Sequence, residues 1–269
     1  MSLKASCHPR KLHQSSCYEK KDLELLRNQW NRKYPTRKIL TRNPAMIRKA
    51  LQEGMTRCKD ELCWMKLVKH KTTRKRIVKK NFAVFHPKNW KKNENEWLSN
   101  VDISNVLSQY KEFHKDFDYV HPSPIDFDSK IGSHCVTDKL CHFQVETYLK
   151  RGITKIAIPL NVDTHEKSGS HWVSLFVDLE RKFVFYFDSA NQSMPPEVRS
   201  LLDRIRKQIP LKEYTQVTQH QQGGSECGMY VLFFLISMLT GKTPKYFRNH
   251  VITDDEVAKF RKIYFNKQI

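Results

Sequence analysis

Three residues have the chemical types that catalysis by a thiol requires, namely His171, Asp188 and Cys227. In such catalysis a thiolate attacks a carbonyl carbon, an imidazole beside it carries the proton, and a carboxylate orients the imidazole. Cys227 lies between a polar loop and a long apolar segment, which predicts the N-terminus of a buried helix. That position favours the thiolate because the helix dipole places partial positive charge there. The pattern therefore predicts Cys227 as nucleophile, His171 as base and Asp188 as the orienting group.

The loop before Cys227 has the residues that an oxyanion hole needs. Gly223 and Gly224 allow a tight turn that leaves backbone N–H groups free to face a developing negative charge. Gln221, six residues before Cys227, adds a side-chain amide donor. We expect Gln221 to take part in the hole. Asn191, three residues after Asp188, is an alternative partner for His171.

Strands and helices that would position these residues follow from the apolar pattern. Residues 172–177 and 183–187 predict two strands of a hairpin, which brings His171 beside Asp188 because antiparallel pairing joins the start of one strand to the end of the next. We predict further elements in this region. They are a helix over 97–110, a strand over 153–160, an amphipathic helix opening at Pro195-Pro196, a strand over 214–218 and a buried helix over 228–239.

Charge divides the chain into two parts. Residues 1–92 hold 26 Lys and Arg against 6 Asp and Glu, whereas residues 93–269 hold 22 of each, so the first part carries the whole net charge of +20. The basic part also predicts short helices over 20–32 and 43–54, the second with Pro44 near its start. We therefore expect a basic, mainly helical arm at 1–92 and a catalytic domain at 93–269. Such a surplus predicts non-specific binding of nucleic acid by the arm, and a merely solubilising basic face is the alternative.

Composition also limits the class of protein. The longest apolar run, 229–239, is too short to cross a bilayer, so we expect no membrane span, and the N-terminus shows no apolar signal segment. Seven cysteines without scaffold-like spacing predict free thiols in a reducing compartment. We expect no metal or cofactor, because two possible zinc sets lack the usual spacing. These sets are Cys58 and Cys63 with His70, and His134 and Cys135 with Cys141 and His142.

Several short motifs, in this order, resemble the ubiquitin-like-protein protease and adenain superfamily over roughly residues 93–265. They are His171-Trp172, Asp188-Ser189, Gln221 and Glu226-Cys227-Gly228. Trp97-Leu98 is similar to the Trp-Leu-Asn-Asp segment of that domain, but Ser99 and Asn100 stand where Asn and Asp are usual. The 160–178 block and the 252–261 tail are similar to maturation proteases of large cytoplasmic DNA viruses of the asfarvirus and iridovirus kind. No such match covers the arm.

This resemblance implies an α+β fold with a papain-like core, in which a central mixed sheet is flanked by helices. It also implies cleavage after Gly-Gly, with Trp172 and Trp97 forming aromatic lids over the substrate. The expected substrates are core-shell polyproteins cleaved during virion maturation, in the viral factory of the host cytoplasm and in the virion. The alternatives are a SUMO-type processing protease or isopeptidase and a non-enzymatic nucleic-acid-binding module.

Overall fold

The computed structural model describes residues 6–11, 14–93 and 95–267, which fall into two compact units. The arm unit comprises residues 1–86 together with 262–269, and the sheet unit comprises residues 87–261. The expected division lay between residues 92 and 93. In the structure the compact arm ends at His86, and the last strand of the chain joins it.

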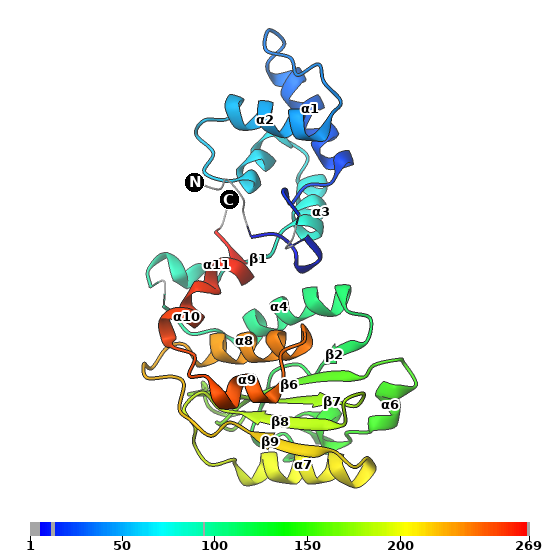
Figure 1. Ribbon diagram of the computed structural model, residues 1–269, viewed down its shortest axis with the longest axis vertical. Coiled ribbons are helices and arrows are strands. Elements are labelled where there is room, and N and C mark those ends of the chain that lie inside the picture. The colour runs from blue at the N-terminus through cyan, green and yellow to red at the C-terminus, as the bar shows by residue number, and fades with distance from the viewer. Residues whose placement is uncertain (1–5, 12–13, 94, 268–269) are drawn as a thin grey trace. The chain divides into compact units, whose positions relative to one another are not determined.

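A twisted mixed sheet organises the sheet unit (Figure 1). Its path is β2-β6-β7-β8-β9, and β3 also pairs with β6. The central pairs β6–β7 and β7–β8 are antiparallel, whereas β2 and β3 run parallel to β6, and β9 runs parallel to β8. The strands are β2 (Phe117–Tyr119), β3 (Ser123–Pro124), β6 (Lys155–Asn161), β7 (Trp172–Asp178), β8 (Phe183–Phe187) and β9 (Lys212–Thr215).

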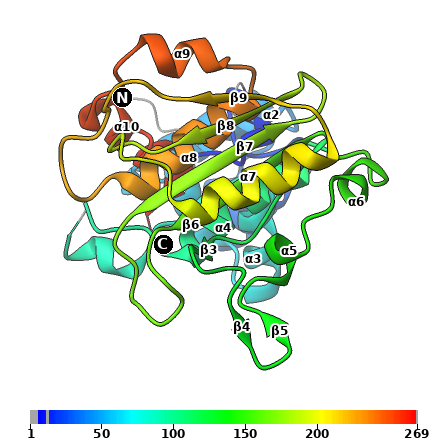
Figure 2. The same ribbon diagram turned by 90° about the horizontal axis from the view of Figure 1, so that it is seen from below.

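Helices cover both faces of this sheet. Helices α4 (Asn100–Phe113) and α8 (Cys227–Leu239) lie on one face and α7 (Pro196–Gln208) lies on the other (Figure 2). The remaining elements of the sheet unit lie around this core. They are η3 (Lys88–Lys91), β4 (Lys130–Ile131), β5 (His134–Cys135), α5 (Asp138–Cys141), α6 (Val145–Leu149), α9 (Pro244–Asn249) and α10 (Asp254–Lys259).

Successive side chains of the central strands point to opposite faces of the sheet, and each face packs against helices. In β7, Val173, Leu175 and Val177 join the cluster that includes Leu201 and Ile205 of α7. The opposite face meets α8, where the Phe234 ring lies 5.0 Å from Phe185 and 4.4 Å from Phe187, between ring centroids. Since both faces are buried, the central strands read as continuous apolar runs. The expected α+β architecture with a central mixed sheet is confirmed.

The arm unit is mainly helical and has a core of its own. Helices α1 (Lys20–Lys33) and α2 (Pro44–Gly54) agree with the predicted ranges, and Asn43 caps α2 by accepting from the backbone N–H groups of Ala45 and Met46. Other elements are η1 (Pro9–Lys11), η2 (Glu61–Leu67), α3 (Lys71–Asn81) and β1 (Val84–Phe85). Helix α11 (Arg261–Tyr264) leads into β10 (Phe265–Asn266), which pairs in parallel with β1.

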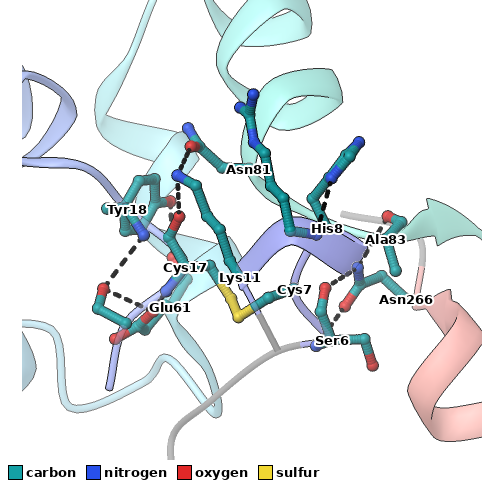
Figure 3. Close-up of a disulfide and its surroundings, with 12 residues drawn as sticks. Ser6, Cys7, His8, Lys11, Cys17, Tyr18, Glu61, Asn81, Ala83 and Asn266 are labelled. Carbon is teal, nitrogen blue, oxygen red and sulfur yellow. Dashed lines mark hydrogen bonds between the residues drawn. A yellow bond between two sulfur atoms is a disulfide. The ribbon is translucent and has the colours of Figure 1, made fainter. Parts of the chain in front are cut away.

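Buried polar groups of the arm are matched to one another (Figure 3). The side chain of Glu61 is fully buried. Its carboxylate accepts hydrogen bonds from the Ser16 hydroxyl and the Cys17 backbone N–H, each at 3.0 Å, and forms an ion pair with Arg48. Lys11, 2% exposed, donates to the Cys17 carbonyl and to the Asn81 side chain. Buried charges are tolerated where such partners replace water.

Cysteine pairing differs from the expected set of free thiols. All seven cysteines lie in the described ranges, and the structure joins six of them as Cys7–Cys17, Cys58–Cys63 and Cys135–Cys141. The Cα atoms of each pair lie 5.1 to 6.3 Å apart, a separation that a disulfide bridges. Proximity in the fold decides the pairing, so the cysteine count no longer argues for a reducing compartment. Cys227 stays free.

Across the residues that the structure describes, no helix combines the length and apolar character that a bilayer crossing demands.

Candidate active site

His171 and Asp188 meet at the rim of the sheet, as the hairpin predicts. His171 directly precedes β7 and Asp188 directly follows β8, and these strands are antiparallel. His171 Nε2 lies 2.6 Å from Asp188 Oδ1. The His171 carbonyl oxygen also accepts from the Val162 backbone N–H at 3.0 Å, which fixes the start of β7.

Backbone groups hold the Asp188 carboxylate in place. Its Oδ1 accepts from the Ala190 N–H at 2.9 Å and its Oδ2 from the Gln192 N–H at 3.0 Å. Asp188 is 1% exposed. Asn191, the alternative partner, is exposed and adopts a positive φ of 54° in the turn that follows. The structure therefore places Asp188, and not Asn191, against His171.

Cys227 begins helix α8 and is 2% exposed. Its thiol lies close enough to His171 to raise the pKa of the imidazole, which also contacts the Asp188 carboxylate. All residues of α8 are buried, and the helix packs against β7, whose first residue follows His171. The apolar helix thus carries the thiol to the sheet rim where the base lies.

The environment of His171 favours its protonated form. Burial lowers the pKa of the imidazole, but hydrogen bonds to Asp188 and Cys227, with the charges of both, raise it to about 9 in total. An imidazole with this pKa is an imidazolium at neutral pH and can supply a proton to a leaving group.

Gln221 lies in the loop before Cys227, and its amide is oriented by two contacts. Its Oε1 accepts from the Ser189 hydroxyl at 2.7 Å, and its Nε2 donates to the Gly223 carbonyl at 2.6 Å. Because an amide NH₂ carries two hydrogens, a second N–H remains for a substrate oxygen. Gln221 is therefore positioned by the residue that follows Asp188.

Trp172 and Trp97 line one pocket of about 470 Å³ together with Asn161 and the 167–169 loop. Trp172 is 7% exposed, and its indole N–H donates to the Leu98 carbonyl at 3.0 Å. Trp97 is 41% exposed. Both tryptophans thus line the same pocket, and Trp172 directly follows His171 in the chain.

Ser99 and Asn100, which depart from the family pattern, begin helix α4. The Ser99 hydroxyl accepts from the Asp102 N–H, and the Asp102 carboxylate accepts from the Ser99 N–H at 2.9 Å, which forms a capping box. The Asn100 side chain accepts from the Val101 N–H at 2.8 Å. These positions therefore have local helix-starting roles in this chain.

Of the two zinc alternatives, one is brought together in space. Cys135, Cys141 and His142 offer ligand atoms within 4.8 Å of one another, but the two sulfurs form a disulfide and so present no thiolates. Cys58 and Cys63 are also paired, and His70 instead caps α3 by accepting from the Thr73 N–H.

Several contacts at the site could not be predicted from any pattern in the sequence. Gln216 donates to the Asp188 carbonyl, Arg261 pairs with Glu226 beside Cys227, and Asp254 accepts from the Gly223 N–H. These residues are distant along the chain from the groups they contact. The similarity of the 252–261 tail to viral proteases was the one signal that pointed to this segment.

A thiol, an imidazole and a carboxylate come together at the rim of the mixed sheet, which is the set of groups that cysteine-type peptidases use. Comparison with known proteins agrees with this class. Residues 150–269 match the Ulp1 protease family, C-terminal catalytic domain.

Relatives of the chain occur in two large DNA viruses. A protein of Acanthamoeba polyphaga mimivirus, whose name describes it as a thiol protease, is 27% identical over 179 residues, which are 64% of this chain and 58% of that protein. A SUMO-1 cysteine protease of African swine fever virus is 33% identical over 121 residues, 42% of this chain and 44% of that protein. The chain thus spans about half the length of these relatives.

The crystal structure of an African swine fever virus protease has the same fold. It superposes with a TM-score of 0.72 at 22% identity and covers 98% of this chain and 96% of that one. The predicted resemblance to this superfamily, with its viral branch, is confirmed by these similarities.

Proposed function

We propose that this chain is a cysteine endopeptidase that cleaves after Gly-Gly, with Cys227 as nucleophile, His171 as base and acid, and Asp188 as orienting carboxylate. One observation carries the proposal: His171 Nε2 lies 2.6 Å from Asp188 Oδ1, and the Cys227 thiol at the start of α8 is close enough to raise the pKa of the same imidazole.

The proposed reaction is acyl transfer in two halves. The Cys227 thiolate adds to the carbonyl carbon, and the oxygen that gains negative charge accepts from the Gln221 amide and backbone N–H groups. Collapse breaks the C–N bond, and the His171 imidazolium gives its proton to the departing amine. His171 then takes a proton from water, whose oxygen displaces the thiolate from the thioester. The products are a carboxylic acid, which loses its proton to solvent, and the regenerated Cys227 thiolate beside imidazolium.

Close packing beside Cys227 supports a preference for glycine. A Cβ atom added to Gly228 would lie 3.0 Å from Leu98 Cβ and 3.4 Å from Trp172 Cδ1. The Trp172 indole is fixed by its bond to the Leu98 carbonyl. We propose that this fixed indole narrows the approach to Cys227, which would favour glycine before the scissile bond.

The substrates that we propose are viral core-shell polyproteins with Gly-Gly-X sites, cleaved in the host cytoplasm and in the virion during maturation. The viral origin of the relatives favours this proposal. The name of the African swine fever virus relative favours a second candidate, the processing of a SUMO-type modifier.

The arm unit supports a further part of the proposal, binding of nucleic acid without base specificity. Residues 1–92 hold 26 Lys and Arg against 6 Asp and Glu, so the net charge of this part is strongly positive. Exposed basic residues of α3 include Lys71, Lys75 and Arg76. Phosphate groups are the natural partners of such a surface.

A peptide assay tests the peptidase proposal. The full chain is incubated with a polyprotein-like Gly-Gly-X peptide, the same peptide with Gly-Val-X, and a SUMO-type precursor, each also with Cys227→Ala. We expect cleavage of the Gly-Gly-X peptide that is at least about 100-fold faster than that of Gly-Val-X and absent in Cys227→Ala. Equal cleavage of both peptides contradicts Gly-Gly specificity, and cleavage of the modifier alone selects the second candidate.

A further inference from the structure

The C-terminal segment of the sheet unit contacts both ends of the loop that precedes the nucleophile. We call residues 220–226 the nucleophile loop and residues 252–261 the tail segment. At the first end of the loop, the Ile252 N–H donates to His220 Nδ1 at 3.1 Å. His220 is 1% exposed and stacks on Phe187 at 5.5 Å, so this end is anchored in the core.

Asp254 binds the middle of the nucleophile loop. Its Oδ2 accepts from the backbone N–H of Gln222 at 3.1 Å and of Gly223 at 2.7 Å. Its Oδ1 accepts from the Tyr230 hydroxyl at 2.9 Å, and Tyr230 lies one turn into α8 after Cys227. One carboxylate therefore joins the loop that carries Gln221 to the helix that carries the thiol.

Arg261 binds the end of the loop. Its guanidinium donates to both carboxylate oxygens of Glu226, at 3.0 and 2.7 Å, and Glu226 directly precedes Cys227. The Glu96 carbonyl accepts a further hydrogen bond at 3.0 Å, and the Trp90 ring lies 4.4 Å from the guanidinium. Both side chains of the ion pair are 7% exposed. Because the two parallel hydrogen bonds of such a buried pair restrain both the position and the orientation of the carboxylate, Arg261 holds Glu226 in place.

We propose that Asp254 and Arg261 are positioning residues that hold the nucleophile loop in the conformation in which Gln221 and the backbone N–H groups face the substrate oxygen. Neither residue touches the reacting atoms, and both act through the loop. This inference rests on the proposed acyl-transfer function, because it concerns the stabilisation of the negative oxygen that such a reaction forms.

Two reactions of Cys227 distinguish an effect on the position of the nucleophile loop from an effect on folding or on substrate preference. Acylation by p-nitrophenyl acetate creates a negative oxygen and needs the hole, but it needs no Gly-Gly recognition. Alkylation by iodoacetamide needs only the thiolate and forms no such oxygen. The ratio of the two rates therefore reports the positioning of the loop. Asp254→Ala, Asp254→Asn, Arg261→Gln and Arg261→Lys are compared with exposed neighbours in the same segment, Asp255→Ala and Lys259→Ala.

We expect the ratio of acylation to alkylation to fall at least about 10-fold in Asp254→Ala and Arg261→Gln, because one misplaced donor costs roughly 10²–10³ in kcat in other oxyanion holes. Arg261→Lys should recover part of the loss, and the two controls should stay within about twofold. If Asp254→Ala does not fold, Asp254→Asn decides by the same ratio. An unchanged ratio in folded variants overturns the proposal. Acylation by the wild type without Gly-Gly cleavage refutes the proposed specificity alone.

Discussion

At the scale of single residues, the contacts of His171 set the proposed chemistry. A buried imidazole beside a carboxylate and a thiol gains more from their charges and hydrogen bonds than it loses from burial, so its pKa rises to about 9. The folded-state value lies above the ordinary value of 6.5. The stability that the protonated ring contributes is therefore complete below about pH 6.5 and is lost as the pH rises through 9.

The rate of peptide cleavage should depend on pH through the same proton of His171. Because the imidazolium protonates the leaving amine, we expect kcat/KM for a Gly-Gly-X peptide to decline through an alkaline limb near pH 9. Asp188→Asn should move this limb to lower pH and lower the rate, since the substitution removes the charge that holds the proton. His134→Gln, an exposed histidine of the same unit, is the control. The measurement is a pH–rate profile, and an unmoved limb in Asp188→Asn would assign the proton to another group.

At the scale of elements, the contact between α8 and the segment before α4 shapes the cleft. Gly228, the second residue of α8, lies so close to Leu98 and Trp172 that an added Cβ would require the leucine to shift by a few tenths of an ångström. The same wall borders the pocket that contains Trp97. Packing at the start of α8 is thus linked to the position of Leu98 and Trp172 in the wall of this pocket, which we propose to be the substrate cleft.

Gly228→Ala tests this link. We expect KM for the Gly-Gly-X peptide to rise about 5-fold or more, because Leu98 and Trp172 move into the cleft. The free energy of unfolding should change by only about 1 kcal/mol, since overpacking costs roughly 1–3 kcal/mol and alanine gains about 1 kcal/mol in a helix interior. Ser237→Ala, near the other end of α8, is the matched variant. Peptide kinetics give KM and chemical denaturation gives the free energy of unfolding. A KM equal to that of the wild type would show that Leu98 and Trp172 do not contribute to substrate binding.

The elements were also the scale at which the sequence was most informative. Residues 172–177 and 183–187 predicted the hairpin that joins His171 to Asp188, and 228–239 predicted α8, because each has a strong apolar pattern. The helix expected to begin at Trp97 starts at Asn100, since Ser99 provides the cap. The contacts of Asp254 and Arg261 have no periodicity that could reveal them, because they depend on where the chain returns after α9.

At the scale of the whole molecule, positive charge is concentrated in the arm unit while the sheet unit is nearly balanced. A truncation at residue 92 would remove β1, the partner of β10, and so would do more than remove charge. Substitution of exposed side chains on α3 is the cleaner test, because α3 contributes few buried residues, Ile77 and Asn81.

Charge reversal at Lys75 and Arg76 should weaken binding of a non-specific DNA duplex. We expect the slope of log K against log salt to become shallower by about 0.9 for each phosphate that the variant no longer neutralises. The controls, Lys139→Glu and Lys245→Glu, change exposed residues of the sheet unit and should leave the slope unchanged. A titration at several salt concentrations gives the slopes. If the α3 substitutions and the two controls weaken DNA binding equally, the binding surface is not specific to α3.

The pairing of β10 with β1 also has a consequence for the order in which the chain matures during synthesis. Asn266 bonds to Ser6 and Ala83, so the arm unit needs residues from both ends of the sequence. Domains form from the N-terminus as the ribosome releases the chain. Here Ser6 and Ala83 must wait for Asn266, so all the residues of the sheet unit are made before the arm can close. A stalled or prematurely ended translation product would therefore carry an incomplete arm, however much of its N-terminus had been made.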